Sequence, residues 1–155
     1  GIVIHSYNRV RENAPIKNKG EYYHRLLDIK IKRTPDDLQA NVELGIQLMA
    51  MGRNEEAEKY FINATKMKPD IPVCYNCLAQ IKFMQKDYKQ ACAYLEEELK
   101  YTGNDLDSVN ALALMYLKMN NKEKARHLLE KILFQNPGHM EARKNLALCG
   151  QSGNL

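Results

Sequence analysis

No apolar run in this 155-residue chain approaches the roughly 18 residues that a membrane-spanning helix needs. The sequence therefore predicts no membrane span, and it shows no signal peptide. A phosphate-binding glycine loop is also absent, because the eight glycines lie mainly in expected turns and near the chain ends. No Ser/His/Asp or Cys/His arrangement has a recognisable local motif. We therefore expect no catalytic residue and no cofactor in this chain.

The chain lacks a disulfide framework, because the spacing of its cysteines does not form one. The four cysteines are Cys74, Cys77, Cys92 and Cys149. This usage indicates a reducing compartment, and we expect a cytoplasmic location. Cys74 and Cys77 have the spacing of a metal or redox motif, but they lie within an expected helix and no second cysteine pair exists. We interpret them as two small buried side chains and predict no metal site there.

Basic residues do not form a stripe along the chain. The first 35 residues hold eight Lys or Arg against three Asp or Glu, a net charge of +5, and the other 120 residues have a net charge of −1. Nucleic-acid binding favours a basic stripe along the binding surface, with exposed aromatic side chains for base stacking. We therefore predict no nucleic-acid partner.

What the chain does have is a fixed period. Four turn-favouring residues stand 34 positions apart: Pro35, Pro69, Gly103 and Pro137. A period of that length is typical of stacked helical hairpins. It divides the chain into units at 38–71, 72–105 and 106–139, followed by a capping helix at 140–149. One hairpin cannot bury its apolar faces alone, whereas a stack of three or more can.

Small residues recur where the two helices of each unit must approach closely. In the first helices they are Gly45, Ala79 and Ala113, and 12 positions later in the second helices they are Ala57, Ala91 and Ala125. Large apolar residues surround them at helical spacing and give each helix one buried stripe. Short polar turns separate the helices. Pro69 and Pro137 are expected to end second helices, because proline disfavours the helical conformation in the residue before it.

This pattern resembles the tetratricopeptide repeat over residues 38–149. The resemblance implies an all-α solenoid, a right-handed superhelix of about three and a half units. Lys82, Glu98 and Gly103 depart from it, because the family favours an aromatic, a small residue and proline at those places. The acidic clusters Glu55, Glu56 and Glu58, and Glu96 to Glu98, are interpreted as solvated parts of the outer, convex side. Glu96 to Glu98 lie near a helix end, where the helix dipole does not favour acids, so a contact with basic partners is the alternative for them.

Residues 21–33 are predicted to form one more helix. It resembles the second helix of a unit whose first helix is missing. We therefore predict a solenoid domain at 21–149, an irregular basic leader at 1–20 and a flexible tail at 150–155. The leader has two interpretations. It is either an expression remnant with a disordered stretch, or the end of an upstream domain.

The second interpretation rests on short motifs in the leader and the helix that follows. They are Ile4-His5-Ser6-Tyr7, Tyr22-Tyr23, Leu26-Leu27 and Pro35-Asp36-Asp37. Their order resembles the C-terminal region of bacterial family 2 glycosyltransferases, in which repeats follow the catalytic domain. The resemblance implies a sugar-nucleotide-dependent enzyme upstream, with His5 near its divalent metal. Ser6 and Asn8 stand where that family often has His and Gly. An ordinary surface histidine is the alternative for His5.

The resemblance implies that a partner would bind on the concave groove, which the first helices line. Helical spacing places these residues there: Gln39, Val42, Ile46, Met49, Val73, Asn76, Gln80, Phe83, Asn110, Leu114, Leu117, Lys144 and Asn145. Asn76 and Asn110 stand 34 apart, so their amides are candidates for holding a peptide backbone, and two solvated polar residues are the alternative. We predict a non-catalytic module that binds a protein or peptide, with a homodimer as a further option. As the glycosyltransferase tail, it would position the acceptor or mediate self-association.

Overall fold

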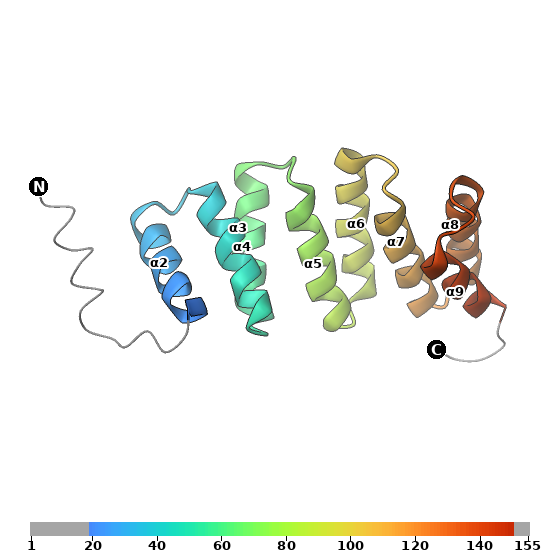
Figure 1. The fold of residues 1–155 in the computed structure, drawn as a ribbon, viewed down its shortest axis with the longest axis horizontal. Coiled ribbons are helices and arrows are strands. Elements are labelled where there is room, and N and C mark those ends of the chain that lie inside the picture. Colours follow the sequence, from blue (N-terminus) through green and yellow to red (C-terminus); the bar gives the residue numbers. More distant parts are fainter. Residues whose placement is uncertain (1–18, 151–155) are drawn as a thin grey trace, which may run out of the picture.

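The computed structural model describes residues 19–150, which form an all-α solenoid, as the sequence predicts. Within that range eight helices follow one another along one axis of the molecule (Figure 1). Their bounds are α2 Lys19–Arg33, α3 Leu38–Ala50, α4 Asn54–Met67, α5 Pro72–Met84, α6 Tyr88–Thr102, α7 Leu106–Lys118, α8 Lys122–Gln135 and α9 Met140–Cys149.

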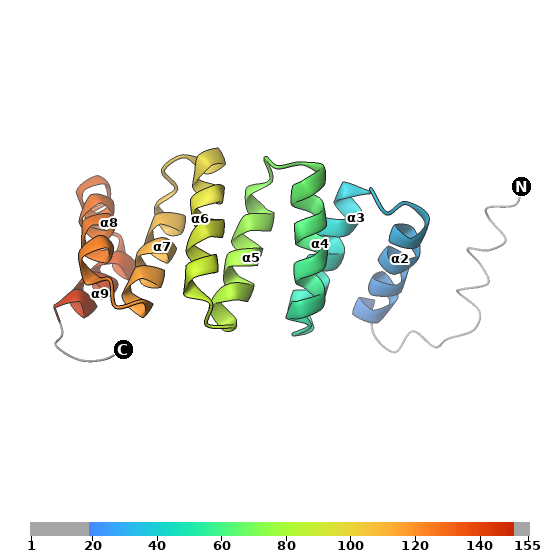
Figure 2. The ribbon, with the colours of Figure 1, turned by 180° about the vertical axis from the view of Figure 1, so that it is seen from behind.

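Helices pair as antiparallel hairpins, α3 with α4, α5 with α6 and α7 with α8. We call α3, α5, α7 and α9 the first helices, and α2, α4, α6 and α8 the second helices. Each helix packs on its neighbours in the sequence, and α9 also packs on α7. The row runs from α2 at one end to α9 at the other, and Figure 2 shows the same order from behind. No helix within residues 19–150 is both long and apolar enough to cross a lipid bilayer.

The 34-residue period extends to the residues that begin the first helices. Their N-caps are Asp37, Ile71, Asp105 and His139, each 34 positions after the last. A carboxylate oxygen of Asp37 accepts from Ala40 N at 2.8 Å, and Asp105 accepts from Ser108 N at 2.9 Å. These bonds satisfy backbone donors that the first turn leaves without a partner. Asp105 therefore caps a helix.

The turns inside the three hairpins share one backbone conformation. Gly52, Lys86 and Asn120, again 34 apart, have φ values of 74°, 62° and 59°. In the second hairpin Lys86 N donates to Phe83 O, and Asp87 N donates to Lys82 O. In the first hairpin the equivalent donors are Gly52 N and Arg53 N, and in the third they are Asn120 N and Asn121 N. This is the Schellman arrangement, which ends a helix through one left-handed residue.

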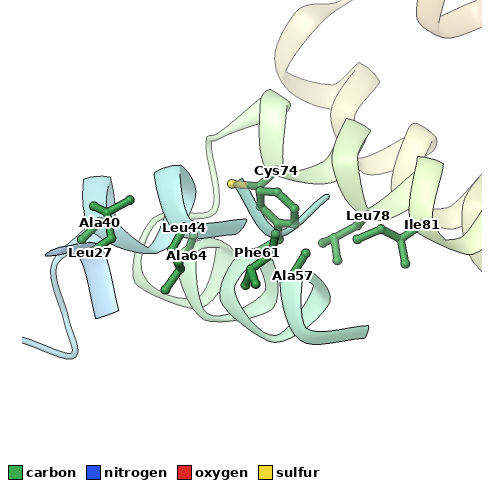
Figure 3. Packing of buried hydrophobic residues seen from close by; sticks show 10 residues of the cluster. Leu27, Ala40, Leu44, Ala57, Phe61, Ala64, Cys74, Leu78 and Ile81 are labelled. Carbon is green, nitrogen blue, oxygen red and sulfur yellow. The ribbon is translucent and has the colours of Figure 1, made fainter. Parts of the chain in front are cut away.

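The core runs through the row between the two layers of helices. Figure 3 shows its N-terminal cluster, from Leu27 through Phe61 to Ile81. Phe61 is fully buried and lies directly over Gly45, where a Cβ atom would be only 2.7 Å from the ring. The predicted small residue at this crossing is therefore required by the size of the ring on the facing helix.

Lys82, where the family favours an aromatic residue, is held by an ion pair. Its Nζ lies 2.6 Å from Oε1 of Glu58, and the two side chains are 13% and 18% exposed. Because Glu58 belongs to α4 and Lys82 to α5, the pair joins the first unit to the second. The departure from the repeat pattern replaces an apolar contact with a half-buried charged one.

Candidate functional site

The first helices turn one side away from the second helices, and we call that side the first-helix face. On α3 the buried residues are Ala40, Asn41, Leu44, Gly45 and Leu48, and the exposed residues are Gln39, Glu43, Ile46 and Ala50. The exposed set has the spacing of one helical stripe. Gln39 Nε2 donates to Glu43 Oε1 at 2.7 Å, and Ile46 beside them is 46% exposed. The stripe therefore joins a polar pair to an apolar side chain.

On α5 the first-helix face also combines apolar and polar side chains. Val73 is 46% exposed and Met84 52% exposed, with Gln80 between them. Met84 was missed at the sequence level, although it continues the helical stripe of Val73 and Gln80. On α7 the face is more covered, because Asn110 and Leu114 are half-buried.

Several residues that we predicted in the groove pack in the core and are not exposed to a partner. Leu117 is 1% exposed and belongs to the C-terminal core cluster, so its assignment to the groove is corrected. Val42 and Met49 are half-buried against the N-terminal cluster. Phe83 and Leu114 are half-buried against the central cluster. The apolar side chains available to a partner are therefore centred on Ile46, Val73 and Met84.

Asn76 and Asn110, the two candidates for an amide ladder, both have partners inside the protein. Asn76 Oδ1 accepts from Gln80 Nε2 at 2.6 Å, and Asn76 Nδ2 donates to Glu98 at 3.3 Å. Asn110 Oδ1 accepts from Asn145 Nδ2 at 3.0 Å, which joins α7 to α9. These bonds fix the orientation of the amides. A peptide would have to share or replace them.

Glu98 corrects our interpretation of the second acidic run as solvated. It is 6% exposed, and it stands where the first and third units have the buried Ala64 and Ile132. Asn76 on α5 and Ser108 on α7 both hydrogen-bond to its carboxylate. Burial raises the pKa of Glu98, and those hydrogen bonds oppose the shift. The other two glutamates of the run, Glu96 and Glu97, are more exposed.

The cysteine pair in α5 lacks the properties of a metal or redox site. Cys74 is buried and Cys77 half-buried, and both thiols are free. Burial raises the pKa of Cys74 to about 11 and raises that of Cys77 as well. Thiolate is the form that binds metals and reacts, so raised pKa values disfavour both roles. Among residues 19–150 no group of three or more His, Cys, Asp or Glu side chains is placed to hold a metal ion.

The remaining predictions lie at the two ends of the chain. Lys144 is exposed and Asn145 half-buried on α9, beside the face of α7. His5 and the motif around it lie outside the described residues, so the glycosyltransferase interpretation stays a prediction. The same holds for the leader up to residue 18 and for the tail beyond residue 150. Lys19 and Gly20, which we predicted as the end of the leader, instead begin α2.

Two family models match overlapping parts of the chain. Residues 42–105 match the tetratricopeptide repeat model, and residues 84–151 match the model for subunit 3 of the anaphase-promoting complex, or cyclosome. Human anaphase-promoting complex subunit 7 is 28% identical over 113 residues, which are 72% of this chain and 20% of that protein. Photosystem I assembly protein Ycf3 of Prochlorococcus marinus (strain NATL1A) is 34% identical over 65 residues, 40% of this chain and 38% of that protein. The chain therefore spans only a minor part of these relatives.

Solved structures show the same fold at low identity. MamA has a TM-score of 0.78 at 21% identity, covering 84% of this chain and 76% of that one. YrrB, described as a TPR protein with an unusual peptide-binding site, has a TM-score of 0.68 at 18% identity, covering 79% and 63%. The first TPR of Spaghetti (RPAP3), bound to an HSP90 peptide, has a TM-score of 0.66 at 18% identity, covering 72% and 89%.

Proposed function

We propose that this chain, a helical solenoid whose residues 42–105 match the tetratricopeptide repeat family, is a non-catalytic module that binds a protein segment on its first-helix face. The observation that carries the proposal is the pair of exposed apolar side chains Ile46 and Val73, each 46% exposed, on successive first helices. Polar groups of Gln39, Gln80 and Asn76 lie on the same helices.

An extended peptide is the class of ligand that suits this surface best. Apolar side chains give such a ligand affinity, while amide groups beside them bind its backbone and fix its register. The face offers both kinds of group, and among the described residues of α3, α5 and α7 it holds no cluster of basic side chains for a phosphate or a terminal carboxylate. YrrB and the RPAP3 repeat, which share the fold, are themselves described as binding peptides. That likeness supports the class of ligand and does not identify the peptide.

The test uses a phage-displayed library of random peptides selected on the full chain. Peptides that bind are then measured against the double variant Ile46→Glu/Val73→Glu, which places two charges where the apolar contacts would be made. We expect affinity to fall at least about tenfold, because burying an unpaired carboxylate costs more than about 1.4 kcal/mol. Phe134→Glu is the matched control, since Phe134 is 88% exposed on α8, outside this face.

The result that contradicts the proposal is equally definite. If the selected peptides bind the double variant as tightly as the native chain, the first-helix face is not the binding surface. Circular dichroism on both variants checks that they keep the helical fold. Both substituted side chains are exposed, so the fold is expected to tolerate them.

A further inference from the structure

The outer side of α8 carries the most exposed large apolar side chain in the described part of the chain. Phe134 is 88% exposed, whereas the next in that part, Met140, is 59% exposed. Phe134 stands 34 positions after Lys100 and 68 after Lys66, which are exposed lysines on α6 and α4. The two earlier units therefore have a charged side chain at this place, and α8 has a ring that one chain leaves in solvent.

Two charged residues of opposite sign flank Phe134 one turn earlier in α8. Glu130 and Lys131 precede it by four and three positions, so they lie on either side of it along the helix surface. Both are exposed, and neither side chain has an ion-pair or hydrogen-bond partner among the residues that the structure describes. Lys124 also lies on this side of α8, but its Nζ is already over the ring of Tyr116, 5.2 Å from the centroid. The charges free to meet a partner are therefore those of Glu130 and Lys131, and with Phe134 we call them the α8 patch.

We infer that the α8 patch binds the α8 patch of a second copy of this chain, with the two helices parallel. A two-fold axis along the helices brings Phe134 of one chain against Phe134 of the other. It also turns the two flanks of the patch toward each other, so that Lys131 of each chain lies beside Glu130 of the second copy. The contact is therefore apolar at its centre and complementary in charge on both sides.

Other partners fit the α8 patch less well. An antiparallel pair of α8 helices would bring the same flank of each helix together, which sets Glu130 against Glu130 and Lys131 against Lys131. It would also place Phe134 against the exposed His127 instead of a second ring. A different protein would have to supply a ring and both charges in matching order, whereas a second copy supplies them by symmetry.

The dimer is expected to be weak, because one helix face buries less than the roughly 1,200 Å² of a stable interface. It leaves the first-helix face open, since α8 belongs to the layer of second helices (Figure 2). The inference is therefore separate from the peptide binding proposed above, and either can fail without the other.

Sedimentation equilibrium of the full chain tests the inference, over concentrations from about 10 μM to about 1 mM. Low salt keeps exposed charge pairs from being screened, and about pH 8 keeps histidine charge out of the result. We expect a monomer–dimer equilibrium in this range. Phe134→Lys, which restores the residue of the two earlier units, is expected to weaken dimerisation at least about tenfold, because it removes both rings from the contact. Met84→Lys is the matched control, since Met84 is 52% exposed on the first-helix face and should not affect dimerisation.

Charge reversal tests the parallel arrangement itself. Glu130→Lys and Lys131→Glu are each expected to weaken dimerisation about fivefold, because each turns two attractive pairs into like-charge pairs. An equal mixture of the two single variants is expected to associate about as tightly as the native chain, since every lysine of one then meets a glutamate of the other. The double variant Glu130→Lys/Lys131→Glu restores both pairs and should dimerise like the native chain.

Four results would overturn the inference. A chain that stays monomeric throughout the concentration range does not self-associate, and a dimer that survives Phe134→Lys uses another surface. A mixture of the single charge variants that dimerises no more tightly than either variant alone contradicts the charge pairs. A mixture that dimerises more tightly than the native chain indicates antiparallel helices instead. All substituted side chains are exposed, so the variants are expected to keep the fold, and circular dichroism checks this.

Discussion

The crossing of α3 and α4 pairs two residues that differ from those in the other two hairpins. In the first unit the pair is Gly45 and Phe61, whereas the equivalent pairs are Ala79 with Leu95 and Ala113 with Leu129. A small first-helix residue thus faces a large ring, and a slightly larger one faces a leucine. We predict that the two positions are energetically coupled, so that Gly45→Ala costs less stability in a chain that carries Phe61→Leu than in the native chain.

The magnitude follows from the distances at the crossing. A Cβ atom on residue 45 would lie 2.7 Å from Cε1 and 2.8 Å from Cζ of Phe61, roughly 1 Å inside the usual carbon–carbon separation. Phe61 is fully buried, so the ring has no free space to move into. Overpacking of this kind costs about 1–3 kcal/mol, and the better helix propensity of alanine offsets about 1 kcal/mol of that.

Phe61→Leu alone removes ring atoms from the same crossing and leaves a gap, at a cost of about 1–2 kcal/mol. In the double variant the new methyl group at position 45 occupies part of that gap. We therefore expect the double variant to be more stable than the sum of the two single effects predicts, by about 1–2 kcal/mol.

Urea denaturation followed by far-UV circular dichroism measures all four proteins of the cycle. Ala79→Gly is the matched control, because Ala79 faces Leu95 and has no ring to accommodate. It should lose about 1 kcal/mol from helix propensity and about 0.8 kcal/mol more from its buried methyl group. Additivity of Gly45→Ala and Phe61→Leu within about 0.5 kcal/mol would refute the argument that the ring excludes a side chain at position 45.

Three further predictions concern the departures from the repeat pattern. Lys86→Gly should stabilise the chain by about 0.5–1 kcal/mol in urea denaturation, because it removes a lysine from the left-handed conformation. Asn120→Gly should raise the free energy of unfolding less, since asparagine tolerates that conformation. Glu98→Gln should be more stable than the native chain at neutral pH. The difference should shrink as pH falls through the raised pKa of Glu98, because the native carboxyl is protonated below it. A difference in the free energy of unfolding that does not depend on pH would contradict this. Glu58→Gln should cost about 1–3 kcal/mol, because it leaves the half-buried Lys82 without its carboxylate partner and with only the neutral Gln85 Oε1 to accept from it. Adding Lys82→Met should recover most of that loss. A double variant no better than the single one would show that the ion pair is not what holds Lys82.

Most of the helical architecture was predictable because the period is carried by residues with a direct local effect. Asp37 and Asp105 cap first helices, and Gly45 allows close approach of two helices. Each of these acts within a few residues or across one hairpin, so a single sequence is enough to find it. The shared left-handed turn was harder, because Lys86 stands at a position where the pattern offers no glycine.

The candidate site was less predictable, since exposure depends on neighbours that are distant in sequence. Leu117 has helical spacing suited to the first-helix face, yet it is buried in the cluster that α7 forms with α8 and α9. Phe83 was placed on the face by the same spacing and is half-buried beside Tyr88, with ring centroids 5.8 Å apart. Helical periodicity gives the direction of a side chain around its own helix. It does not give what the next helix covers.

Departures from the 34-residue register carry more information than agreements with it, because each marks a place where the chain meets something other than the usual neighbour. Glu98 stands among buried apolar equivalents, and its carboxylate joins α5, α6 and α7 through hydrogen bonds. Lys82 likewise stands where the other units have Leu48 and Tyr116, and its ammonium group pairs with Glu58 on α4. Each of these departures therefore keeps its place in the fold because a neighbouring helix supplies the polar partner that the repeat pattern does not.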